Sequence, residues 1–392
     1  MSGIIASINF TNKNVFPYLI AGMYGLQHRG QDGVGIGYFN QEEMCEIKGN
    51  GLLSDLDIET DRTSSALGFL KYAFSKENKN IALMPYRHEK SFVAMDGNHL
   101  KNLEDPLVKV ELSKDQLQCY RDPCGVKPLI IGQLDDIWIV SSESCAIESI
   151  GGKILRDVFP GEKIIIDEDG LHSFIDKQYR PQHCLFEMVY IAREDSIIDG
   201  VSVYDARLKM GEALYKECPL EADLVFGAPD SGMIAALGYA KASQIPYQKA
   251  LVKNRYINRT FIEMDPKVKR DNVNIKLSAV RSIIEGKRII LVDDSIVRGF
   301  TIKRIVNVLK KAGAKEIHVL IASPAIKIED HLSIDIPKRE LLLAYDKSNE
   351  EIKQEIACDT LHFLSLSSLK KACGNKGYYS RYFDGKELEK SL

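Results

Sequence analysis

The sequence predicts two domains: a β-rich first half, then an α/β unit with a parallel sheet. Before about Cys184, short strand-like segments are separated by polar, Gly-rich turns. After it, apolar strands alternate with amphipathic helices, which is the pattern of a parallel sheet covered by helices. We therefore expect a domain boundary near residues 180–190.

Composition narrows the class of protein. The chain has 392 residues, of which 45% are hydrophobic and 27% charged, as in ordinary soluble globular proteins. A formal net charge of −3 predicts no general attraction to nucleic acid or membrane. No apolar run is long enough to span a membrane and the N-terminus lacks a signal pattern, so we expect a cytoplasmic protein.

The eight cysteines are scattered along the chain and form no C-x-x-C pair. The zinc motif H-E-x-x-H is also absent from the sequence. This pattern favours reduced, packed thiols over a disulfide framework or a structural zinc site.

The first half opens with a predicted strand over residues 1–8. Ser2 would become the first residue if Met1 were removed, which a small second residue permits. Further on we expect a Gly-rich turn within 24–36, a strand over 91–98 that runs into a turn, a turn at 121–129, and strands at 138–142 and 163–167.

The second half repeats a strand, a polar turn and a helix. The pattern predicts helices over 201–217, 233–242 and 302–312, and strands over 223–227, 288–292 and 318–323. Two of the turns, at 228–232 and 293–301, contain small and acidic residues before a helix N-terminus. Such turns hold phosphorylated ligands in α/β sheets.

The turn after the strand over 288–292 contains the residues best suited to bind a ligand in this half. Loop amides between Ser295 and Thr301 could bind a phosphate, while Asp293 and Asp294 could hold ribose hydroxyls or hydrated Mg²⁺. The alternative is an ordinary strand-to-helix turn whose carboxylates cap the helix or face solvent.

Between the two turns lies a basic stretch, Lys253–Arg281. It has eight Lys or Arg residues against three acidic ones. A stretch with this charge could close as a lid over a polyanionic ligand, or it could be a solvated surface loop. Charge alone leaves both interpretations open.

Taken together, these segments resemble the glutamine phosphoribosylpyrophosphate amidotransferase (amidophosphoribosyltransferase) family. The resemblance is strongest in the strings 292–299, 253–256 and 259–261. It covers residues 27–36, 121–129, 141–161 and nearly all of 186–325, and more weakly 334–367. It implies an N-terminal-nucleophile (Ntn) hydrolase-like αββα glutaminase domain over 1–185, a type I phosphoribosyltransferase domain over 186–372 and a short tail over 373–392. In this family, ammonia from glutamine displaces pyrophosphate from 5-phosphoribosyl 1-pyrophosphate (PRPP) in purine synthesis.

The resemblance also implies a set of ligand-binding residues in the second domain. Mg²⁺ would be held by Asp293 and Asp294, with Ser231 nearby. The lid would include Tyr256, in a catalytic position. Phe300 departs from the family, which usually has Thr there. The remaining implied PRPP contacts are Asp230, Gly232, Lys253, Arg255, Arg259, Lys276, Ser295, Arg298, Gly299 and Thr301.

The implied glutaminase site departs from the family pattern at several positions. Ser2 replaces the nucleophilic Cys, and an alcohol is the weaker nucleophile. Lys71 replaces the Arg that grips the glutamine carboxylate, and Asp96 replaces the oxyanion-hole Asn, where a carboxylate has no hydrogen to donate. Only 23 residues separate Gly97 from Arg121, where the family has a longer segment. We expect glutaminase activity to be absent or very weak.

Many family members hold a [4Fe–4S] cluster with four cysteines. Here Cys184 matches the first ligand position, Asp330 stands at the second, and the tail 373–392 has no C-x-x-C. One remaining ligand does not hold a cluster, so we expect none.

These observations lead to one principal hypothesis and one alternative. The first is a phosphoribosylamine synthase that uses PRPP, Mg²⁺ and free ammonia, or ammonia from a partner glutaminase. The alternative is a non-catalytic subunit that binds PRPP or a purine nucleotide and regulates a complete paralogue in a hetero-complex; Phe300 favours it slightly. Slow glutaminase turnover by Ser2 ranks last. The family further implies a homo-oligomer and a purine nucleotide inhibitor.

Overall fold

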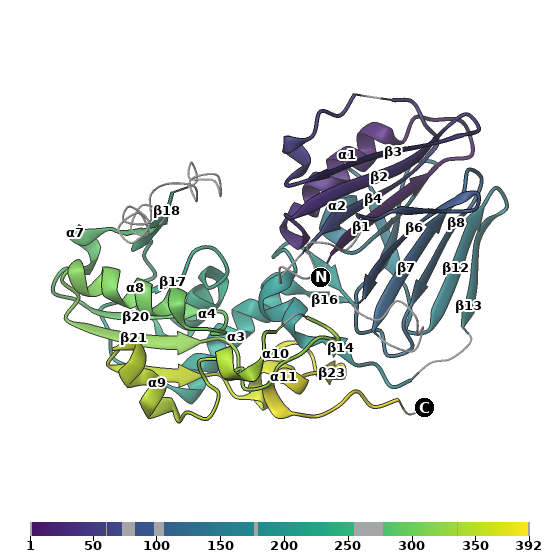
Figure 1. Cartoon of the computed structure of the whole chain (residues 1–392). Coiled ribbons are helices and arrows are strands. Elements are labelled where there is room, and N and C mark those ends of the chain that lie inside the picture. The colour runs from purple at the N-terminus through teal and green to yellow at the C-terminus, as the bar shows by residue number, and fades with distance from the viewer. Residues whose placement is uncertain are drawn as a thin grey trace.

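The computed structural model describes residues 2–59, 61–72, 83–97, 106–175, 179–254, 277–334 and 336–390. Figure 1 shows two sheets packed face to face in the first half and a helix-covered sheet in the second. The predicted fold class, an Ntn hydrolase-like αββα unit followed by an α/β phosphoribosyltransferase unit with a parallel sheet, is confirmed.

The first half contains a seven-stranded and a six-stranded antiparallel sheet. Their strand orders are β11-β9-β10-β1-β4-β2-β3 and β13-β12-β8-β7-β6-β5. The strands are β1 (Gly3–Ile8), β2 (Gly33–Asn40), β3 (Glu43–Asn50), β4 (Ser65–Lys71), β5 (Tyr86–His88), β6 (Ser91–Gly97), β7 (Leu107–Leu112), β8 (Leu117–Arg121), β9 (Ile130–Leu134), β10 (Ile137–Ser141), β11 (Lys153–Asp157), β12 (Glu162–Asp167) and β13 (Gly170–Ile175).

Apolar side chains on the inner faces of the two sheets form one core, which includes Ile4, Leu67 and Val110. The outer face of the seven-stranded sheet is covered by the helices α1 (Phe16–Gly25) and α2 (Ser144–Ser149), which contact each other. Strand β1 lies at the centre of its sheet, between β10 and β4. This position places Ser2 at the buried end of the central strand. Two short 3₁₀ turns, Gln27–Arg29 and Leu53–Asp55, complete this half.

The second half is built on a four-stranded parallel sheet in the order β17-β20-β21-β22. Its strands are β17 (Leu224–Gly227), β20 (Arg288–Asp293), β21 (Glu316–Ile321) and β22 (Thr360–Phe363). Its helices are α3 (Val203–Glu217), α4 (Met233–Ser243), α7 (Arg281–Ile284), α8 (Phe300–Lys311), α9 (Asn349–Ile356), α10 (Leu366–Ala372) and α11 (Arg381–Asp384), with a π-helical turn η4 (Glu187–Ile191) and a 3₁₀ turn η6 (Arg339–Leu341).

Small two-stranded ribbons join these elements. β14 (His183–Cys184) pairs with β23 (Tyr378–Tyr379), so the tail returns to the junction between the halves. β15 (Ile197–Ile198) pairs with β16 (Val201–Ser202), and β18 (Leu251–Lys253) pairs with β19 (Leu277–Ala279). No helix within the described ranges has the length and apolar character needed to cross a bilayer.

Candidate active site

An acidic pair lies at the carboxyl end of β20. Asp293 is the last residue of the strand, and its carboxylate accepts a hydrogen bond from the backbone N of Asp294 at 3.0 Å. Both side chains are buried. The carboxyl ends of strands in an open parallel sheet form the usual ligand crevice of this architecture, so the pair occupies a binding position.

A second loop meets this pair from the neighbouring strand. β17 lies beside β20, and the loop that follows β17 brings the Ser231 hydroxyl to Oδ2 of Asp294. The Ser295 hydroxyl donates to the other oxygen of the same carboxylate. Gly232 permits the approach, because a Cβ there would lie 2.3 Å from the carbonyl oxygen of Val292. The structure therefore brings together the predicted residues of both turns.

The two carboxylates stand in an environment that disfavours their charge. Burial, and then the neighbouring Asp294, raise the pKa of Asp293 well above its usual value. Burial also raises the pKa of Asp294, although Ser231, Ser295 and Arg207 act in the opposite direction. Such a pair gains from a hydrated divalent cation or from hydroxyl donors, so it fits both Mg²⁺ and a ribose.

Among the residues that the structure describes, no group of three or more His, Cys, Asp or Glu side chains is arranged to hold a metal ion. Two protein carboxylates with substrate oxygens and water are, however, the usual way in which proteins bind Mg²⁺. The donor set formed by Asp293 and Asp294, with Ser231 beside them, is of this kind.

The loop between the acidic pair and α8 has the form of an anion site. Gly299 has a φ of 77°, and the helix begins directly after it with no side chain capping its first amides. Unsatisfied amides at a helix N-terminus attract phosphate. Phe300 is 73% exposed, and Thr301 is exposed beside it. The bulky ring thus points to solvent.

The predicted lid is described only at its edges. The ammonium group of Lys253, at the end of β18, lies 2.8 Å from Oδ2 of Asp230 in the loop after β17. Lys253 therefore reaches the predicted pyrophosphate-binding turn. Arg255, Tyr256, Arg259 and Lys276 lie outside the described residues.

Sequence reasoning missed Arg207, which lies on the buried face of α3. Its Nε donates to the Met188 carbonyl at 3.0 Å and its Nη2 to the Ala192 carbonyl at 2.8 Å, so it holds the turn η4. Its positive charge also lowers the pKa of Asp294. An arginine within the apolar stripe of a predicted helix was the available signal. Burial raises the pKa of Tyr190, on η4, and the negative charges of Asp294 and Asp293 raise it further.

In the first half, Ser2 and Asp96 are in direct contact. Oδ1 of Asp96 accepts a hydrogen bond from the backbone N of Ser2 at 3.1 Å, and the Lys127 ammonium lies 3.7 Å from Oδ2. Burial opposes the charge of Asp96, but Lys127 and Arg29 outweigh it and lower the pKa of this carboxyl. Asp96 is therefore an ionised, paired carboxylate.

Lys71 ends β4, which pairs with β1 so that Leu70 faces Gly3. The register places Lys71 at the same end of the sheet as Ser2. The side chain is buried, and burial lowers the pKa of its ammonium group. Lys71 of β4 and Asp96 of β6, in the other sheet, thus both lie near the end of the chain where Ser2 precedes β1.

A second missed residue, Arg29, joins this site to the other half of the chain. Its Nε donates to the Ser2 carbonyl at 3.3 Å, and its Nη2 lies 2.7 Å from Glu187 of η4. Its Nη1 also contacts Glu143, which in turn accepts a hydrogen bond from the Ser196 hydroxyl at 2.7 Å. Glu187 and Ser196 both belong to the second half.

Cys184 and Asp330 lie in a buried polar cluster with two tyrosines of the tail. The Cys184 sulfur is 3.8 Å from the Tyr382 hydroxyl, and Asp330 accepts a hydrogen bond from the Tyr379 hydroxyl at 2.5 Å. Burial raises the pKa of the Cys184 thiol to about 11. The predicted description of Cys184 as a packed thiol agrees with this environment.

Comparison with known proteins finds relatives that match this chain over most of its length. Residues 207–350 match the model of the phosphoribosyl transferase domain. The chain is 37% identical to an amidophosphoribosyltransferase of Archaeoglobus fulgidus, covering 91% of each chain, and 36% identical to that of Bacillus subtilis, covering 91% of this chain and 86% of the relative.

The solved structures agree with the sequence relatives. The glutamine PRPP amidotransferase from B. subtilis complexed with ADP and GMP superposes with a TM-score of 0.88 at 34% identity, over 98% of this chain and 96% of that one. The similarity thus extends over both halves. The chain belongs to the amidophosphoribosyltransferase family.

Proposed function

We propose that this protein transfers ammonia to C1 of PRPP, giving 5-phosphoribosylamine and pyrophosphate for purine synthesis, and that it does not obtain the ammonia by its own glutaminase activity. The observation that carries the proposal is the contact of Ser231 with Asp294, which joins the two predicted ligand loops at one edge of the parallel sheet. The same edge offers the uncapped N-terminus of α8 to the 5′-phosphate.

The acidic pair and Mg²⁺ would have different roles in the reaction. Nitrogen of ammonia attacks C1, the bond from C1 to the pyrophosphate oxygen breaks, and the nitrogen then loses a proton to solvent. Asp293 and Asp294 orient the ribose hydroxyls and lie near the positive charge that develops on the ring. Bound Mg²⁺, held by this pair with Ser231 nearby, would neutralise charge on the departing pyrophosphate.

The remaining PRPP contacts are assigned by position. Asp230, Ser231, Gly232 and Lys253 would bind the pyrophosphate, and Ser295, Arg298, Gly299 and Thr301 the 5′-phosphate. Arg255, Tyr256, Arg259 and Lys276 would belong to a lid that excludes water, because water would otherwise hydrolyse PRPP. The intact acidic pair favours this catalytic role over that of a purely regulatory subunit.

Asp96 gives two reasons for the loss of glutaminase activity. Its carboxylate would repel the oxyanion that forms when the amide of glutamine is attacked. It also lies 3.1 Å from the Ser2 nitrogen. If Met1 is removed, that nitrogen becomes the terminal amine, and a carboxylate at this distance stabilises its protonated form. A protonated amine cannot act as the base that a serine nucleophile needs.

Other parts of the proposal follow from the relatives. The domains would be 1–185, 186–372 and the tail 373–392. No [4Fe–4S] cluster would be held, since Asp330 and the tail tyrosines engage the surroundings of Cys184. The structure of the B. subtilis relative is a complex with ADP and GMP, so we expect this chain to bind purine nucleotides, which would inhibit it. A homo-oligomer, and a partner that supplies ammonia, complete the proposal.

Purified protein should release pyrophosphate from PRPP when Mg²⁺ and ammonium are supplied at moderately alkaline pH, where free ammonia is abundant. Asp294→Asn should lower that rate by about 100-fold or more, because it removes charge next to the reacting ring. Failure of the wild-type protein to release pyrophosphate would reject the transferase proposal and favour the regulatory alternative.

A further inference from the structure

A pocket of about 560 Å³ lies apart from both sites, between the segment 327–329, the loop 339–347 and α11. Its volume is in the range of small-molecule pockets, roughly 300–1,000 Å³. Four basic and two acidic side chains line it, so its charge is positive in a chain that is negative overall. The charged residues are Lys327, Arg339, Lys347, Arg381, Glu329 and Asp346.

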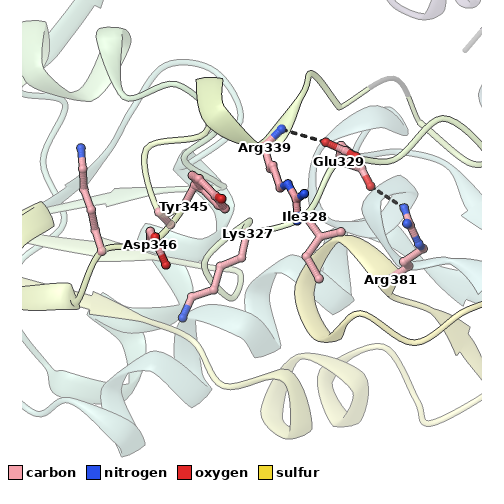
Figure 2. A pocket seen from close by; sticks show the side chains of 9 residues that line it. Lys327, Ile328, Glu329, Arg339, Tyr345, Asp346 and Arg381 are labelled. Atoms are coloured by element: carbon pink, nitrogen blue, oxygen red, sulfur yellow. Dashed lines mark hydrogen bonds between the residues drawn. The ribbon is translucent and has the colours of Figure 1, made fainter.

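Two of the basic groups are already engaged. Lys347 pairs with Glu355 of α9, and Arg381 pairs with Glu387 at 2.8 Å and donates to the Glu329 carbonyl. The Glu329 carboxylate accepts a hydrogen bond from the backbone N of Arg339 at 2.9 Å, so it serves to shape the loop (Figure 2). These contacts build the walls of the pocket.

The other two cations remain available to a ligand. Within the described part of the chain, the Lys327 ammonium has no acidic partner. Arg339 has only a 3.6 Å contact with the exposed Glu340, which is a weak interaction in water. Its guanidinium lies 5.8 Å from the ring centre of Tyr345, which orients it toward the pocket (Figure 2).

From this arrangement we infer that the pocket binds a sugar phosphate. Lys327 and Arg339 supply charge-assisted hydrogen bonds to a phosphate group. The exposed carboxylate of Asp346 would repel a bare anion but accepts hydrogen bonds from sugar hydroxyls. Tyr345 and Ile328 offer partly apolar surface to the carbon skeleton. The combination selects a ligand that carries both a phosphate and neighbouring hydroxyls.

The pocket is connected to the loop over residues 295–301, called the phosphate loop because it is the proposed site of the 5′-phosphate. Its wall continues into Leu343, whose backbone N donates to the Val297 carbonyl at 2.8 Å. The Leu343 side chain also fills the space beside Gly299. A ligand that orders Tyr345 and Arg339 would therefore also restrain the loop that receives the 5′-phosphate of PRPP. Binding at the two places is coupled, and by linkage each ligand alters the affinity of the other.

Calorimetric titration of the full chain with ribose 5-phosphate tests the site itself. Lys327→Ala and Arg339→Ala should each weaken one binding event by about tenfold, the effect of losing one charge-assisted hydrogen bond. Lys241→Ala, at an exposed lysine of α4, is the matched control and should change nothing. Because this measurement needs no turnover, it stands even if the proposed transferase activity fails.

Two further arms make the inference specific. Asp346→Asn should weaken the binding of ribose 5-phosphate but should not weaken the binding of inorganic phosphate. In the ammonium-dependent assay, ribose 5-phosphate should change the apparent KM for PRPP less in Lys327→Ala than in the wild type. The inference would be overturned if Lys327→Ala and Arg339→Ala left the binding of ribose 5-phosphate unchanged. It would also be overturned if inorganic phosphate bound as tightly as the sugar phosphate.

Discussion

Arg29 Nη2 lies 2.7 Å from Oε1 of Glu187, in a buried ion pair that joins the 3₁₀ turn Gln27–Arg29 to the turn η4. Arg29 also holds the Ser2 carbonyl, and Arg207 holds the other side of η4. Contacts therefore run from Ser2 through Arg29 and η4 to Arg207, whose positive charge lowers the pKa of Asp294. These contacts link the proposed glutaminase-like site of the first half to the turn η4 of the second.

Glu187→Gln should destabilise the protein by about 3 kcal/mol, because it leaves the charge of Arg29 only partly compensated in a buried position. Urea unfolding measures the loss. Glu350→Gln is the matched control, since its pair with Lys353 is 2.7 Å long but largely exposed, and it should cost less than about 1 kcal/mol. Equal effects of the two substitutions would contradict the structural role of the Arg29 pair.

Asp96→Asn should make the free energy of unfolding less dependent on pH in the acidic range. The pKa of Asp96 is lowered below its usual 3.8, so its ionised form stabilises the fold at neutral pH. That contribution is present above the unfolded-state pKa and is lost as the pH falls through the lower folded-state pKa. The difference in unfolding free energy between wild type and variant should therefore shrink below about pH 4. A difference that does not vary with pH would show that Asp96 is not a paired carboxylate.

Asp293→Asn should raise the melting temperature while it lowers activity. Because the pKa of Asp293 is raised, ionising it costs the folded state free energy at every pH above that raised value, and the cost vanishes below the unfolded-state pKa. The amide removes the cost at neutral pH. Pyrophosphate release should fall by about 100-fold or more. A lower melting temperature at pH 7 in the absence of Mg²⁺ would refute the electrostatic account of the acidic pair.

Two neighbouring residues of the phosphate loop should respond in opposite ways. Gly299→Ala should abolish most activity, since a Cβ there would lie 2.6 Å from Leu343 Cδ2 and the φ of 77° disfavours alanine. Phe300→Thr should change the KM for PRPP by less than about threefold, because an exposed ring leaves the amides of α8 accessible. A large gain from Phe300→Thr would mean that the ring obstructs the site.

Local patterns predicted most of the parallel sheet and the positions of the two polar turns at its edge. The strand expected over 288–292 extends to Asp293, and α8 begins at Phe300, two residues before the apolar periodicity does, because Gly299 sets the turn. The helix expected from residue 201 begins at Val203, since Val201 and Ser202 pair with β15 and the Ser202 hydroxyl caps the helix. These differences depend on caps and hairpins that periodicity does not report.

The polar connections could not be predicted in the same way. Arg29 meets partners 114 and 158 residues away, and no spacing rule relates such positions. Asp96 lies on β6 and Lys127 in the loop between β8 and β9, so their pairing depends on how the elements of the first half pack together. The family resemblance singled out Ser2 and Asp96 in the sequence, but only the fold brings the two residues into contact.

A comparison of two nitrogen sources decides whether this protein uses free ammonia rather than glutamine. Purified protein is given PRPP and Mg²⁺ with either ammonium or glutamine at the same alkaline pH, and pyrophosphate and glutamate are measured together. We expect pyrophosphate with ammonium, and neither product above background with glutamine. Glutamate release matched by pyrophosphate in the glutamine reaction would contradict it, since Ser2 and Asp96 would then form a working glutaminase.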